Sequence, residues 1–126
     1  WLPDSLANRL RWWTECLRLA SQSPWVGFGP GSFENVSGAA QLSPGLRSLY
    51  AHSFPLQEAV QIGFPGAAFL ILFLVQLLLK VRDPFLSGSA LALFFHGIFD
   101  FSLNIYGIFL VFLLILALIL VATKCL

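Results

Sequence analysis

Two kinds of ionisable side chain in this sequence could do chemistry. Arg9 carries a guanidinium, which can bind a phosphate group through two parallel hydrogen bonds. His52 carries an imidazole, which with an ordinary pKa of about 6.5 is largely neutral at neutral pH and can accept a proton. Each also has a structural interpretation, in which Arg9 pairs with lipid phosphate and His52 packs its loop. Residue type alone favours the structural interpretation.

A second pair lies deep in apolar sequence. His96 and Asp100 are four residues apart, so they would share one face of a helix and could pair. Ionisable groups within a membrane span are rare, face the interior of the bundle and mark candidate functional sites. A buried pair that joins two helices is the preferred interpretation here, and a role in supporting a site near the outer face is the intermediate one.

The composition is that of a membrane protein. Of the 126 residues, 58% are hydrophobic and 10% are charged, whereas soluble domains are about half apolar and about a quarter charged. Nearly all charged residues lie in residues 1–58 or in the short segment 80–83. We therefore expect an outer part, residues 1–58, and a transmembrane region, residues 59–126. A net charge of +1 without a basic cluster argues against nucleic-acid binding.

Three apolar stretches predict an all-α fold with three transmembrane helices. They run from about 62 to 79, 86 to 103 and 105 to 122, each near the about 20 residues that a helix needs to cross a bilayer. Three spans place Lys80, Arg82 and Lys124 on one side of the membrane. The positive-inside tendency assigns that side to the cytoplasm, so the outer part faces the periplasm or cell exterior.

The outer part is predicted to begin with an amphipathic helix over residues 6–20, suited to the bilayer surface. At about 100° per residue, Arg11, Glu15 and Arg18 fall on its polar face. The opposite face carries Leu6, Leu10, Trp13, Leu17 and Ala20. Arg9 lies about 60° from the centre of that apolar face, so it would point sideways along the membrane.

Residues 23–48 are rich in Gly, Pro and Ser and are predicted to form an irregular loop. The segment GFGPGSF at 27–33 lacks the Gly-Lys-Ser/Thr of a P-loop, so its glycines are interpreted as turn residues. A helix is expected to begin at Pro55 and to continue unbroken into the first span. Its unpaired first amides and positive dipole end would favour an anion, and His52 stands immediately before them.

The order and spacing of several short motifs resemble the large outer loop of O-antigen ligases and polymerases. RLRWW at 9–13, GFGPGSF at 27–33, AHS at 51–53 and GFPG at 63–66 follow one another as in that family, and FHGIFDF at 95–101 looks like its late spans. The resemblance covers about residues 6–120. It departs from the family at Ser53, where Asn is frequent, and at Gln61, where an acidic residue is frequent.

The resemblance implies a metal-independent, inverting glycosyltransferase without a cofactor, which moves a glycan from undecaprenyl pyrophosphate to an acceptor hydroxyl or amine. Such a reaction needs positive charge at the departing pyrophosphate and a base at the acceptor. By their match to the family's motifs, Arg9 is the candidate pyrophosphate clamp and His52 the candidate base. Arg47, Gln57 and Arg11 are candidate substrate-binding residues.

The same resemblance implies a multi-pass protein of the bacterial inner membrane, with its active face outward. Its partners would be the lipid-linked glycan, an acceptor glycan or lipid A core, and membrane lipid. Because the chain begins at Trp1 without a signal-peptide pattern, we expect the C-terminal piece of a longer protein with further spans upstream. Ligase, polymerase and protein glycosyltransferase all remain open.

Two other classes also remain open. A transporter or flippase fragment for a lipid or anionic solute would use His96 and Asp100 as a proton relay. A membrane scaffold without catalytic activity would use neither site.

Overall fold

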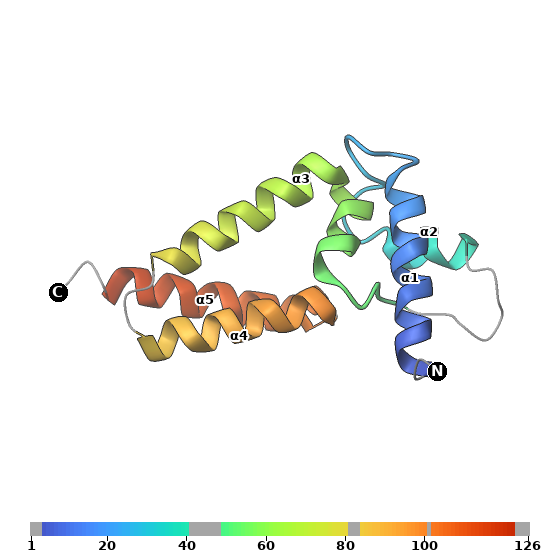
Figure 1. The fold of residues 1–126 in the computed structure, drawn as a ribbon. Coiled ribbons are helices and arrows are strands. Elements are labelled where there is room, and N and C mark those ends of the chain that lie inside the picture. The colour runs from blue at the N-terminus through green and yellow to red at the C-terminus, as the bar shows by residue number, and fades with distance from the viewer. Residues whose placement is uncertain (1–3, 41–48, 81–83, 101, 123–126) are drawn as a thin grey trace.

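The computed structural model describes residues 4–40, 49–80, 84–100 and 102–122 (Figure 1). These residues form α-helices and one short 3-10 helix, and no strand occurs among them. The predicted all-α class is therefore confirmed. The elements are α1 (Asp4–Ala20), α2 (Phe33–Ala40), α3 (Phe54–Leu79), α4 (Pro84–Phe99), η1 (Ser102–Asn104) and α5 (Tyr106–Ala122).

Within the described ranges, α3 is the helix that is both long and apolar enough to cross a membrane. The apolar helices α4 and α5 coincide with the second and third predicted spans but are shorter. The second predicted span, 86–103, does not continue as one helix, because α4 ends at Phe99 and residues 102–104 form η1. Gly97 permits this tight return: a Cβ there would lie 2.6 Å from Cδ1 of Leu103, which packs directly on the glycine.

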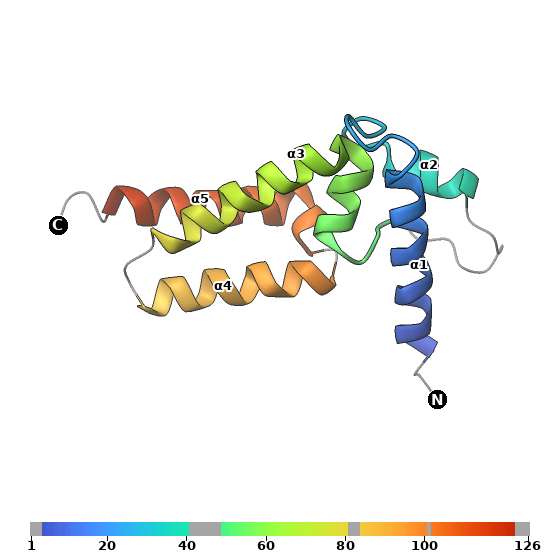
Figure 2. The ribbon, with the colours of Figure 1, turned by 45° about the horizontal axis from the view of Figure 1, so that its top comes forward.

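The helices are arranged with the polar part at one end of the apolar part. The second half of α3, together with α4 and α5, extends away from α1 and α2, and the last turn of α5 lies at the far end (Figures 1 and 2). The C-terminal end of α3, which Lys80 caps, also lies at that far end. Arg82 and Lys124, used to predict the orientation, lie outside the described residues.

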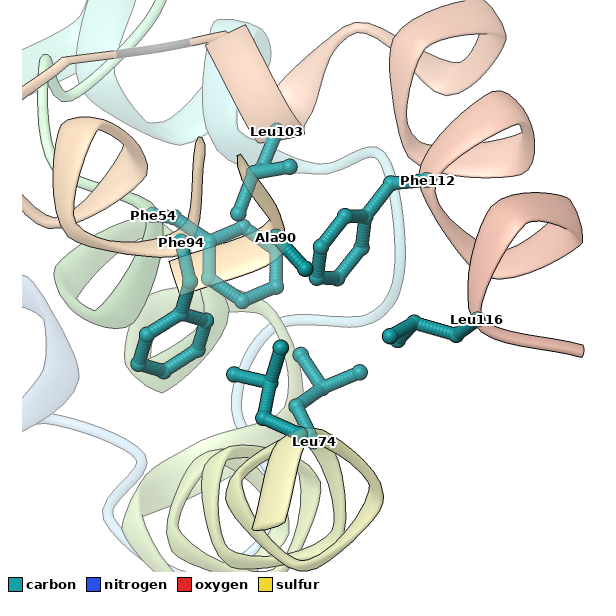
Figure 3. Packing of buried hydrophobic residues seen from close by; sticks show 8 residues of the cluster. Phe54, Leu74, Ala90, Phe94, Leu103, Phe112 and Leu116 are labelled. Carbon is teal, nitrogen blue, oxygen red and sulfur yellow. The ribbon is translucent and has the colours of Figure 1, made fainter. Parts of the chain in front are cut away.

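The apolar helices share one core and leave much apolar surface outside it. Side chains from α3, α4, η1 and α5 point toward one another in this core (Figure 3). Its buried members are Phe54, Leu74, Leu78, Ala90, Phe94, Leu103, Phe112 and Leu116. Phe69, Leu79 and Phe85 are 73%, 80% and 80% exposed, a distribution that suits contact with lipid or with other helices more than contact with water.

The α3 helix is not unbroken, contrary to the sequence-based expectation. Gly63 has φ 75° and ψ 168°, so a kink separates a short first arm from the longer apolar arm. A helix break leaves carbonyl groups without their helical partners. The loop at 24–31 supplies partners, since the N–H of Phe28 donates to Val60 O at 2.9 Å and that of Gly29 donates to Gln61 O at 2.8 Å.

The loop also accepts a hydrogen bond from α3 at the kink. The N–H of Phe64 donates to Pro24 O at 2.8 Å. A Cβ on Gly63 would lie 2.6 Å from the carbonyl carbon of Trp25, and one on Gly27 would lie 2.4 Å from that of Gln61. Both glycines therefore serve close backbone approach between the loop and α3, a more demanding role than the turns predicted for the 27–33 segment.

The predicted irregular loop over 23–48 also contains a helix, α2. Its residues Phe33 and Ser37 are buried, and Phe33 belongs to a second core with Cys16 and Leu19 of α1 and Val60 of α3. A short sequence with Gly and Ser has little intrinsic helix stability, so this packing is what stabilises α2. That tertiary contribution is invisible in the local sequence.

Candidate active site

His52 sits in a backbone conformation that few residues adopt. Its φ of 51° lies in the left-handed region, which is unfavourable for a residue with a side chain. Such a conformation persists where surrounding contacts determine it, and it is concentrated at functional sites. Two contacts from α1 do so here: the ring of Trp12 stacks on the imidazole with centroids 4.6 Å apart, and Trp13 Nε1 donates to His52 O at 3.1 Å.

Gln57, a predicted substrate-binding residue, is buried and also supports this segment. Its Oε1 accepts a hydrogen bond from the N–H of Ala51 at 3.1 Å. The residue before His52 is thus fixed to the first arm of α3, while His52 itself is fixed to α1. Gln57 therefore has a structural role at its carbonyl oxygen.

Arg9 lies on the same side of α1 as the two tryptophans, three and four residues before them. Its Nη1 donates to the carbonyl oxygen of Phe99 at 2.8 Å. Phe99 is the last residue of α4, whose terminal carbonyls lack helical partners and carry the negative end of the helix dipole. The guanidinium has five N–H donors, and this bond uses one of them.

Arg9 and Asp100 act on His52 in opposite directions. Burial lowers the pKa of the His52 imidazole below its ordinary value of 6.5, and the charge of Arg9 lowers it further. Asp100 opposes both effects, since its carboxylate favours the protonated ring. Asp100 Oδ1 lies 3.7 Å from His52 Nδ1, an ion-pair distance. The net lowering of the pKa keeps His52 in the neutral form that a base requires.

Asp100 lies between two histidines, and it forms the predicted pair with His96, although that pair is not buried. Asp100 Oδ2 lies 3.6 Å from His96 Nε2, but the His96 side chain is 59% exposed. The expectation that both residues lie inside one span is corrected for Asp100 alone, because α4 ends at Phe99 and Asp100 follows it at the end facing α1, whereas His96 lies within α4. Asp100 instead reaches the segment around His52.

The other predicted substrate-binding residues are not gathered here. Arg11 is exposed on α1, and Arg47 lies outside the described residues. The contribution of Trp12 and Trp13 was not predicted, because their amphipathic rings suggested only an interfacial position. Their spacing from Arg9 was the available signal, since residues three and four apart share one side of a helix.

One comparison with known proteins shows the family of this chain. A family model described as O-Antigen ligase matches residues 1–71 of the chain. The chain belongs to the O-antigen ligase family. This confirms the resemblance noted from the motifs, and the matched range includes Arg9 and His52. The search of curated proteins and the search of solved structures each found no match.

Membership of the O-antigen ligase family implies a membrane protein with glycosyltransferase-type activity in surface-polysaccharide assembly. Asp100 lies beyond the matched range. The structure nevertheless brings Asp100, which directly follows α4, to within 3.7 Å of His52.

Proposed function

We propose that this part of an O-antigen ligase forms the reaction centre for transfer of a glycan from undecaprenyl pyrophosphate to an acceptor hydroxyl or amine. The observation that carries the proposal is the position of His52. It is close to the Arg9 guanidinium, stacked on Trp12 and in ion-pair range of Asp100. A cation for the leaving group and an oriented base for the acceptor are the two groups that the reaction requires.

The reaction begins when the acceptor oxygen or nitrogen attacks the anomeric carbon of the lipid-linked glycan. His52 removes the acceptor's proton, while the bond from that carbon to the pyrophosphate breaks and undecaprenyl pyrophosphate leaves with the electron pair. Arg9 binds the pyrophosphate oxygens and stabilises the charge that develops there. Attack from the side opposite the leaving group inverts the anomeric configuration, and the step needs no metal ion because Arg9 supplies the positive charge.

Asp100 acts on the base and does not touch the substrate. Its carboxylate faces His52 Nδ1, so it favours the orientation and tautomer in which the other ring nitrogen takes the proton. This position of Asp100 also favours the transferase over the transporter or flippase alternative, since a relay confined to His96 and Asp100 would not require His52.

The proposed reaction also requires a particular placement of the helices in the membrane. The long arm of α3, α4 and α5 would be the three spans, with α1, α2 and His52 at the outer face of the bacterial inner membrane. Leu6, Leu10 and Leu17 of α1 are 38%, 43% and 48% exposed, which leaves this stripe available to the bilayer surface beside the site. The lipid-linked pyrophosphate would lie at this depth, next to Arg9.

Replacement of the two central residues in the full-length parent protein tests the proposal. Arg9→Ala and His52→Asn are expected to reduce transfer from purified lipid-linked glycan by about a hundredfold or more, because a clamp and a base each contribute on this order. Asn is chosen at residue 52 because it tolerates the left-handed backbone. Rates are normalised to the amount of protein in the membrane.

Arg18→Ala is the matched control for Arg9→Ala. Arg18 is on the same helix and pairs with Glu15 at 2.6 Å on an exposed face, so its removal should leave transfer unchanged. Full transfer by both Arg9→Ala and His52→Asn at normal protein levels would overturn the site assignment.

A further inference from the structure

A pocket of about 380 Å³ opens beside the proposed reaction centre, between α2, the first arm of α3 and the start of α5. Its volume lies in the range of small-molecule binding sites. Tyr50 lines the pocket, and His52, whose ring stacks on Trp12, follows two residues later. At about 3.3–3.6 Å per residue, the Cα atoms of Tyr50 and His52 can be no more than about 7 Å apart.

The strongest sign that this pocket has a ligand is Asn104. The residue is 9% exposed and lines the pocket, yet neither its Oδ1 nor its Nδ2 has a hydrogen-bond partner among the described residues. Leaving a buried polar group unpaired costs about 1–3 kcal/mol, so such groups normally have a partner. A side-chain amide both donates and accepts, as a ligand hydroxyl does.

The rest of the lining suits a sugar and not a phosphate. Gln57 and Gln61 also line the pocket, and their carbonyl oxygens already accept the N–H groups of Ala51 and Gly31. Their NH2 groups are donors suited to hydroxyl oxygens. Glu34 is the charged residue among the described lining residues, and its carboxylate would accept hydroxyl hydrogen bonds but repel a pyrophosphate.

We propose that this pocket binds a saccharide ring of the reacting glycan, with Asn104 as its central polar contact. The inference rests on the proposed function, because that function supplies the glycan whose reacting end lies at His52. It divides the site into two parts: Arg9 binds the pyrophosphate, and the pocket holds an uncharged sugar a short distance away. The ring belongs to either the donor glycan or the acceptor, since both present hydroxyl groups at this position.

Binding to the full-length protein tests the proposal without requiring turnover. The probes are the lipid-free oligosaccharide released by mild acid from the strain's own O-polysaccharide, the corresponding core oligosaccharide, and inorganic pyrophosphate, each titrated by calorimetry. Asn104→Ala is expected to weaken binding of one of the two oligosaccharides by about tenfold, the equivalent of one or two hydrogen bonds. Pyrophosphate binding should not change. The oligosaccharide that responds identifies the ring as donor or acceptor.

Two further variants separate ligand binding from folding. Glu34→Gln changes an exposed residue at the pocket wall, so it should leave the fold intact. It should weaken binding of the same oligosaccharide by a few-fold. Ser89→Ala removes an exposed hydroxyl that donates to Phe85 O within α4, away from the pocket, and should change nothing.

The outcomes distinguish this proposal from the one on which it rests. Unchanged affinity for both oligosaccharides in Asn104→Ala and Glu34→Gln overturns the saccharide pocket, even if Arg9→Ala and His52→Asn abolish transfer. Loss of folded protein in Asn104→Ala, with unchanged affinity in Glu34→Gln, assigns Asn104 to folding and also overturns it. Weakened oligosaccharide binding in both pocket variants, with transfer retained by Arg9→Ala and His52→Asn, supports the pocket and rejects the proposed reaction centre.

Discussion

The imidazole of His52 is stacked on the indole of Trp12, with ring centroids 4.6 Å apart and the planes inclined by 19°. The next residue of α1, Trp13, donates its indole N–H to the carbonyl oxygen of the same histidine at 3.1 Å. Two consecutive residues of α1 therefore fix both the ring and the backbone of His52. In this family member, the helix expected to lie on the membrane surface also positions the proposed base.

This contact predicts that Trp12 affects transfer through His52. Trp12→Ala should lower kcat by about tenfold, because a stacked aromatic pair is worth roughly 0.5–1.5 kcal/mol and its loss lets the ring leave its position. Trp12→Phe keeps an aromatic face and should retain most of the rate. Steady-state transfer assays on both variants test this, and equal rates for Trp12→Ala and the wild type would show that the stack has no part in positioning the base.

The pH dependence of transfer should depend on Asp100 in a specific direction. The base must be neutral, and the pKa of His52 lies below 6.5. The value of kcat/KM should therefore fall only when the pH drops below this lowered pKa. The Asp100 carboxylate raises this pKa, so Asp100→Asn should lower it further and move the acidic limb of the profile to still lower pH. The maximal rate should also fall, on the order of tenfold, since the imidazole loses its orienting partner.

A purely structural role for Asp100 gives a different result. The Asp100→Asn profile would then fall in height with its acidic limb unmoved. His96→Gln provides a comparison, since His96 contacts Asp100 but is not in the proposed reaction path. It should leave the rate nearly unchanged, whereas the relay of the transporter alternative would require it.

Gly27 and Gly29 form a natural pair for testing the contact between the loop and the α3 kink. Both have positive φ, at 67° and 101°, so Ala at either costs about 1–2 kcal/mol in backbone strain. A Cβ on Gly27 would also lie 2.4 Å from backbone of Gln61, whereas a Cβ on Gly29 would meet nothing within 4 Å. Gly27→Ala should therefore lower the midpoint of thermal unfolding in detergent clearly more than Gly29→Ala.

A third substitution provides the baseline for that comparison. Gly88 lies within α4 with open space around it, so Gly88→Ala should be neutral or stabilising by about 0.5–1 kcal/mol. Equal losses for Gly27→Ala and Gly29→Ala would show that the loop does not depend on close approach to α3.

Features encoded by local pattern could be predicted from the sequence. Apolar stretches and one polar segment were sufficient to predict the helical class, and α1 was predicted to within two residues of its start at Asp4. Motif order was sufficient to predict the family. Each of these depends on residue type and spacing along a single stretch of chain.

Features that depend on distant contacts could not be predicted. The kink at Gly63 exists because the 24–31 loop binds the carbonyls of Val60 and Gln61, and nothing near Gly63 in sequence reveals that loop. The early end of α4, where Leu103 packs on Gly97, is likewise hidden by the continuous apolar pattern of 86–103. Because α4 ends at Phe99, Asp100 reaches His52 instead of lying within a span, and no local pattern joins two residues so far apart in the chain.

Arg9 presents one ambiguity that a single conservative change resolves. Its bond to Phe99 O could mean that it merely caps α4, and a Lys at this position could cap the same carbonyl with its own N–H donors. Lys cannot reproduce the two parallel hydrogen bonds that a guanidinium makes to phosphate. Arg9→Lys should therefore keep the thermal stability of the wild type but lose transfer by about tenfold or more, whereas Arg9→Ala should lose both. Transfer by Arg9→Lys at the full wild-type rate would mean that residue 9 contributes only positive charge or a helix cap, and the bidentate pyrophosphate clamp would have to be assigned to another residue.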